Sequence, residues 1–288
     1  MKHCTLIFLF LFPVSMLLHA QDSIIYENIF RHQIVNGKLT KKSYVTEQNT
    51  YNLNKDKVLT LRYDNSIPNV TGFTLFFYQN GLLFSEEMFD MEKNPLSIIR
   101  YSYSKKGLKT EEKDYKPVDS AMQCVKTITW AYKNALPVKK TVKDENGKKT
   151  SVTVYSNTDS KSTDNTRFLS GTGAVYPVSA SCVTMYSDGR KISQQSDTTY
   201  SDGSSKAVAI EYSYDDTIDR LVNESWYNSR HEPIKTVEYK WKSDGTLSGK
   251  GTYDPSGNCL EYLSYRYKSH IVNLGDQKPY DLGGDGKR

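Results

Sequence analysis

The chain has 288 residues, 37% of them hydrophobic by a count that includes 22 tyrosines, and it carries 38 basic and 33 acidic side chains. The charges are interspersed, so the small positive excess indicates a solvated surface and argues against a nucleic-acid-binding protein. The apolar share is too low for a thick two-layer core, which favours a thin architecture with half-buried tyrosines.

The N-terminal residues predict export. Lys2 and His3 precede a nearly apolar run from Leu6 to Leu18, and Ala20 supplies a small residue at the expected cleavage point. This order is typical of a secretory signal peptide, so we predict one over 1–20. No later stretch is apolar enough for a transmembrane helix, so we expect no membrane span after cleavage. The predicted location is the periplasm, the cell surface or the medium.

Turn-forming residues recur about every thirteen positions along much of the chain, a spacing that suits one strand and one turn. Asn-Gly and Asp-Gly accept the positive φ angles of tight hairpin turns. The predicted turns are Asn80-Gly81, Lys93-Asn94-Pro95, Lys106-Gly107, Asn134-Ala135, Asn146-Gly147, Asp188-Gly189, Asp202-Gly203, Arg220, Glu232-Pro233, Asp244-Gly245 and Ser256-Gly257.

Residues between the turns alternate with period two, as half-buried antiparallel strands do. Ile99, Tyr101 and Tyr103 share one face, while Arg100 and Ser102 share the other. The sequence therefore predicts an all-β fold in which repeated antiparallel hairpins form an elongated, curled β-meander sheet.

One stretch breaks this rhythm. Ser156 to Thr166 contains no apolar residue, which predicts a solvated loop. The predicted organisation follows from that break, with a disordered tail at the glycine-rich end. It comprises a signal peptide at 1–20, an N-terminal β-repeat lobe at 21–155, a polar loop or linker at 156–180, a C-terminal β-repeat lobe at 181–270 and a tail at 271–288.

Several segments resemble known hairpin repeats. Tyr212-Ser213-Tyr214-Asp215 followed by Arg220-Leu221 looks like the tyrosine-aspartate repeats of bacterial Rhs-type proteins, and Tyr239 to Leu247 and Tyr101 to Leu108 are variants. The stretch from Phe77 to Phe89 resembles the Asn-Gly-Leu hairpin units of MORN-like repeats. The resemblance implies a long curled sheet that contacts glycans or proteins, and it says little about role.

Residues for catalysis or metal binding are scattered. His32, His231 and His270 each stand alone, so we predict no metal site. Adjacent acidic residues such as Glu86 and Glu87 point to opposite faces of a strand, so they do not form a glycosidase pair. We predict no catalytic residue and no cofactor. Three cysteines follow the signal peptide and are either idle thiols or include one disulfide. They are Cys124, Cys182 and Cys259.

Aromatic residues at period two form ladders on the predicted strands. Inward ladders would pair across strands as core, whereas solvent-facing rings would bind sugar chains or a partner's surface. Both interpretations stay open. The candidate binding residues are Trp130, Tyr132, Tyr239 and Trp241.

The favoured hypothesis is an exported, non-enzymatic repeat protein that presents a β-sheet binding surface at the bacterial cell envelope to a glycan or a protein. A second hypothesis is a structural component that assembles through free sheet edges. The third, less favoured, is an enzyme that acts on envelope polysaccharide.

Overall fold

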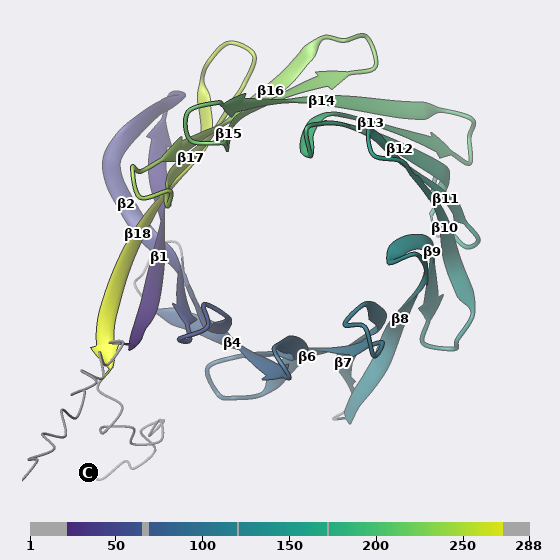
Figure 1. The fold of residues 1–288 in the computed structure, drawn as a ribbon, viewed down its shortest axis with the longest axis horizontal. Coiled ribbons are helices and arrows are strands. Elements are labelled where there is room, and N and C mark those ends of the chain that lie inside the picture. The colour runs from purple at the N-terminus through teal and green to yellow at the C-terminus, as the bar shows by residue number, and fades with distance from the viewer. Residues whose placement is uncertain (1–21, 65–68, 120, 172, 273–288) are drawn as a thin grey trace, which may run out of the picture.

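The computed structural model describes residues 22–64, 69–119, 121–171 and 173–272, and it shows one antiparallel sheet of 18 strands closed into a ring (Figure 1). Each strand pairs with its sequence neighbours, and the first strand also pairs with the last. In chain order the strands are β1 (Asp22–Val35), β2 (Lys38–Tyr51), β3 (Lys57–Tyr63), β4 (Val70–Gln79), β5 (Leu82–Phe89), β6 (Pro95–Tyr103), β7 (Lys109–Val118), β8 (Ala121–Lys133), β9 (Leu136–Asp144), β10 (Lys149–Asn157), β11 (Lys161–Phe168), β12 (Pro177–Ser187), β13 (Arg190–Tyr200), β14 (Ser205–Asp215), β15 (Arg220–Asn228), β16 (Pro233–Trp241), β17 (Leu247–Tyr253) and β18 (Cys259–Val272).

Ring closure corrects the predicted shape. The all-β, antiparallel hairpin architecture is confirmed, but the elongated curled sheet is wrong, because β1 and β18 are paired from Asp22↔Val272 to Arg31↔Leu263. The suspected relationship to Rhs-type and MORN-like repeat proteins is wrong for the same reason, since the chain forms a closed barrel. The predicted signal peptide and nearly all of the predicted tail lie outside the described residues.

Two-residue hairpin turns form at two of the predicted Asn-Gly and Asp-Gly pairs, whereas Asn146-Gly147, Asp202-Gly203 and Asp244-Gly245 lie in longer turns in which the glycine has the positive φ. Asn80 and Gly81 have φ angles of 53° and 73°, and Asp188 and Gly189 have 50° and 76°. This left-handed backbone matches the twist of the flanking strands. Ala135 adopts the same conformation at a φ of 64°, although its Cβ makes that conformation unfavourable.

The polar stretch at 156–166 contains much of a strand rather than only a loop. β11 pairs with β10 on one side and β12 on the other, so the sheet continues across the predicted linker. Its polar side chains form cross-strand hydrogen bonds. Ser162 Oγ donates to Asn157 Oδ1 at 2.7 Å, and the hydroxyls of Thr166 and Thr153 lie 2.8 Å apart. Hydrogen bonds of this kind support a strand whose one large apolar side chain is Phe168 at its end.

The two faces of the sheet are covered to different degrees. Ile210 is 6% exposed while Glu211 beside it is exposed, and Thr153 is 1% exposed while Val154 is 54% exposed. Side chains converge inside a closed ring and diverge outside it, so the more covered set points inward. We call these sets the inner and outer faces. Among the described residues, the buried apolar side chains are Ile210, Val237 and Cys259, which fits the low apolar share.

Candidate binding face

Nine aromatic side chains form a circle on the inner face, one from each even-numbered strand. Eight lie within the last three residues of their strand, and the ninth comes from the longer β18. Strand alternation and cross-strand register place them all on the same face as Thr153 and Ile210. All nine are half-buried. This aromatic girdle consists of Tyr51, Tyr78, Tyr103, Tyr132, Tyr155, Tyr186, Tyr214, Trp241 and Tyr267.

Several girdle residues are held by hydrogen bonds to the beginning of the preceding strand. The hydroxyls of Tyr78, Tyr103 and Tyr132 donate to main-chain carbonyl oxygens at 3.0, 2.8 and 2.7 Å. Trp241 Nε1 makes the same kind of bond to Leu221 O at 2.8 Å. Each bond connects two adjacent strands, so these rings are fixed at the rim of the barrel.

A second row of tyrosines lies on the same strands, two residues before the girdle residue. Carboxylates orient this row. Tyr101 donates its hydroxyl hydrogen to Glu86 Oε1 at 2.6 Å, and Tyr239 donates to Glu224 Oε1 at 2.8 Å, with the same 15-residue spacing. Burial, followed by the hydrogen bond to glutamate, raises the pKa of both phenols well above the usual value. Both phenols therefore stay neutral hydrogen-bond donors at physiological pH.

Cations lie over many of these rings. Lys109 Nζ is 4.5 Å from the ring centroid of Trp130 and 5.0 Å from that of Tyr101, and Lys109 also forms an ion pair with Glu112 at 2.8 Å. Arg220 Cζ is 5.5 Å from the ring centroid of Trp241. Such cation–π contacts contribute about 0.5–1 kcal/mol each at exposed sites. The inner face thus combines aromatic rings, carboxylates and cations in one layer.

The four predicted binding residues belong to this layer, but they occupy two separate places. Trp130 and Tyr132 lie on β8, whereas Tyr239 and Trp241 lie on β16, and these strands are not neighbours. All four point inward and are half-buried. Their role in binding stays a prediction. The sequence also did not reveal the partner carboxylates Glu86 and Glu224, although a glutamate 15 residues before a Tyr-x-aromatic pair would have been a usable signal.

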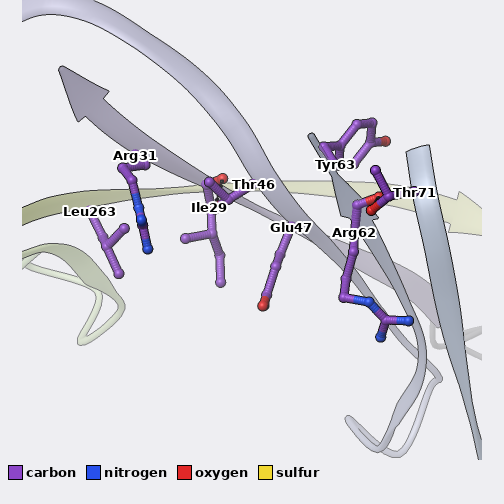
Figure 2. A pocket seen from close by; sticks show the side chains of 8 residues that line it. All are labelled: Ile29, Arg31, Thr46, Glu47, Arg62, Tyr63, Thr71 and Leu263. Carbon is purple, nitrogen blue, oxygen red and sulfur yellow. Dashed lines mark hydrogen bonds between the residues drawn. The ribbon is translucent and has the colours of Figure 1, made fainter. Parts of the chain in front are cut away.

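A small charged pocket of about 290 Å³ lies where β1, β2, β3 and β18 meet. Figure 2 shows Ile29, Arg31, Glu47 and Arg62 projecting to the same side of the sheet. Arg31 Nη2 forms an ion pair with Glu261 at 2.8 Å, and Arg62 Nη1 donates to Thr74 Oγ1 at 2.6 Å. These arginines are engaged with the wall of the barrel, but the buried Arg31 Nε has no hydrogen-bond partner among the described residues, so the pocket keeps one unsatisfied donor.

The described residues contain no group of three or more His, Cys, Asp or Glu side chains placed to hold a metal ion. His32 Nε2 is hydrogen-bonded to Ser264 Oγ at 2.9 Å, and His231 stacks on Tyr227 with ring centroids 4.4 Å apart. Cys124, Cys182 and Cys259 are free thiols. In the part of the chain that the structure describes, no helix has the length and apolar character needed to cross a membrane.

No protein family and no curated protein matches this chain. Among solved structures, it is similar to a porin-like protein from Bacteroides uniformis, with 10% identity, a TM-score of 0.44 and coverage of 86% of this chain and 96% of that one. A porin-like protein from Bacteroides vulgatus has 10% identity, a TM-score of 0.38 and coverage of 84% and 97%. A putative outer membrane lipoprotein-sorting protein domain from Vibrio parahaemolyticus has 8% identity, a TM-score of 0.25 and coverage of 88% of each chain. Scores of this size do not establish a shared function.

Proposed function

We propose that this chain is an exported, non-enzymatic β-barrel of the bacterial cell envelope that binds a glycan chain on its inner face. The observation that carries the proposal is the aromatic girdle, with one half-buried ring from every second strand. A sugar ring has an apolar C–H face and a rim of hydroxyls. An aromatic ring beside a carboxylate complements both of these features.

The cations of the inner face refine the ligand. Lys191 Nζ lies 4.5 Å from the ring centroid of Tyr212, and Arg190 Cζ lies 5.5 Å from that of Tyr214. Lys191 and Arg220 put positive charge beside the rings that would stack on sugars. Lys109 and Arg190 are already paired with carboxylates, Lys109 with Glu112 and Arg190 with Asp216 and Asp219. The preferred glycan therefore carries carboxylate or phosphate groups, which pair with lysine and arginine.

The closed ring removes the main support for the assembly hypothesis. Each described strand has a pairing partner on both sides, because β1 and β18 join the two ends of the sheet. Association through free edges needs an unpaired strand, and closure removes such edges. Binding through a face of the sheet is the remaining route for the described strands.

The glycan proposal predicts that Trp130→Ala and Trp241→Ala each weaken binding of an acidic glycan by about tenfold, because each removes an aromatic stacking surface. The experiment is a screen of envelope glycans on an array, followed by calorimetric titration of the best acidic glycan. Raising the salt concentration should weaken the same binding, since charge pairs at a solvated site are screened.

The matched control is Tyr115→Ala. Tyr115 is a half-buried aromatic residue with a cation over its ring, Arg100 at 5.3 Å, but it points to the outer face. Its removal should leave glycan affinity unchanged while thermal unfolding shows that all three variants remain folded. Equal losses from inner and outer variants, or a parent protein that binds no glycan, would reject the proposal.

The outer face suits water, and this feature gives a second prediction. Exposed charged side chains point outward from five strands around the ring. They are Arg100, Lys139, Arg167, Glu211 and Lys240. An arginine or lysine facing lipid near the bilayer midplane costs about 2–4 kcal/mol. We expect the purified protein to partition into the aqueous phase of a Triton X-114 separation, and recovery in the detergent phase would contradict an aqueous barrel.

A further inference from the structure

An apolar groove of about 700 Å³ interrupts the polar outer face. It lies along β2 to β5, and its centre is built from Leu59, Leu61, Phe73, Leu75 and Phe89. Cross-strand register pairs Leu59 with Leu75 and Leu61 with Phe73, and it also pairs Phe73 with Phe89. Apolar outward positions of three adjacent strands therefore meet at the centre of the groove, and Glu87 on β5 lies on the same face opposite Leu75.

These side chains do not belong to a closed core. All five are half-buried and point away from the inside of the ring. The rings of Phe73 and Phe89 stack with centroids 5.1 Å apart, so the floor of the groove is fixed. Elsewhere the outer face carries charged residues, such as Arg100 on β6 and Lys139 on β9, together with single exposed apolar side chains such as Phe77 and Val154. An isolated apolar hollow on a polar surface is typical of a ligand-binding site.

The size of the groove favours a small ligand over a protein partner. Pockets for small molecules are typically about 300–1,000 Å³, and this groove lies within that range. A stable protein interface buries about 800 Å² on each partner, and it would have to extend onto the charged surface around the groove. A hydrocarbon chain, by contrast, uses only the apolar floor.

One charged side chain lines the groove. Lys93 lies in the β5–β6 turn, where it adopts a φ of 66° and its amide donates to Asp90 O at 3.3 Å. The remaining polar lining comes from Gln48, Thr50 and Tyr26. The groove thus has an apolar floor and a single cationic position on a short, hydrogen-bonded turn.

We propose that this outer groove binds the hydrocarbon chain of an anionic amphiphile, and that Lys93 pairs with its acidic group. The chain lies over the leucines and phenylalanines and loses its contact with water, which is the main driving force. The ammonium group distinguishes an acidic headgroup from a neutral or cationic one. This site is independent of the aromatic girdle, which lies on the opposite face of the sheet.

The test is calorimetric titration of the purified chain with palmitate, hexadecanol and hexadecyltrimethylammonium, each below its aggregation concentration. Palmitate should bind at one saturable site and more tightly than the other two. Leu75→Gln should weaken palmitate binding by at least about tenfold, because it puts an amide on the apolar floor. Lys93→Glu should weaken palmitate binding by about tenfold and leave the affinity for hexadecanol unchanged. It should improve binding of the cationic amphiphile.

Two outer-face variants serve as matched controls. Val154→Gln changes an apolar residue of β10 that is 54% exposed, and Lys139→Glu reverses a charge on β9. Both should bind palmitate as the parent does. Lys93→Glu alters an exposed turn and should not disturb folding, so it tests the headgroup contact even if Leu75→Gln is unstable. Palmitate binding that is absent, or that is unchanged in Lys93→Glu, overturns the proposal.

Discussion

Glu27→Ala is expected to lower the free energy of unfolding by about 3 kcal/mol, because it leaves three polar partners without an acceptor. Glu27 Oε2 accepts a hydrogen bond from Asn49 Nδ2 at 2.8 Å and another from the hydroxyl of Tyr51 at 2.9 Å, and Tyr267 also donates to this carboxylate. Asn49 is only 1% exposed, and its Oδ1 accepts from Thr60 Oγ1 at 2.6 Å.

This network matters because it crosses the closure of the ring. Glu27 lies on β1, its partners lie on β2 and β18, and Thr60 extends the chain of hydrogen bonds to β3. A barrel with little apolar core depends on such polar contacts to hold its first and last strands together. Loss of the carboxylate should therefore destabilise the whole ring rather than one hairpin.

Urea unfolding followed by circular dichroism measures this effect. Glu211→Ala is the matched control, since Glu211 is exposed on the outer face and accepts a 3.3 Å hydrogen bond from Tyr227. Its loss should change stability by less than about 0.5 kcal/mol. The network argument fails if Glu27→Ala is as mild as Glu211→Ala.

Most of the local structure could be predicted from the sequence, because turns and alternation are short-range signals. Asn80-Gly81 and Asp188-Gly189 form tight turns since their backbone tolerates positive φ. Period-two alternation correctly placed Tyr101 and Tyr103 on one face. The polar strand β11 was missed because seven of its eight residues are polar, and hydrogen bonds with neighbouring strands hold it.

Ring closure could not be predicted from the same signals. The alternation of β1 and β18 would be identical at the two edges of an open sheet, whereas closure depends on the strand number, tilt and register of the whole sheet. The pairing of Glu27 with Tyr267 connects residues at opposite ends of the chain. The aromatic girdle has the same origin, because only closure turns a tyrosine or tryptophan on every second strand into a circle.

The barrel is expected to lose stability as the pH rises above about 10, and the tyrosines of the inner face are the cause. Burial, with the charge of and hydrogen bonds to Glu27, Glu86 or Glu224, raises the pKa of the phenols well above the ordinary value. In the unfolded chain the same phenols ionise near pH 10. Above that pH the unfolded state binds fewer protons than the folded state, so the free energy of unfolding falls. The phenols that carry this effect are Tyr51, Tyr101, Tyr239 and Tyr267.

Urea unfolding at pH 8, 9, 10 and 11, combined with absorbance at 295 nm, tests this expectation. The contribution of these phenols to the free energy of unfolding should be constant up to about pH 10 and then fall. Their ionisation should coincide with unfolding rather than precede it. The double variant Tyr101→Phe and Tyr239→Phe should show a shallower fall, because two of the shifted groups are gone, whereas Tyr227→Phe on the outer face should keep the parent's slope. Lysines also lose their charge in this range, and they are present in all three proteins, so the difference in slope isolates the phenols. If every tyrosine ionised near pH 10 in a barrel that stays folded, the hydrogen bonds to the inner carboxylates would not be holding these phenols neutral.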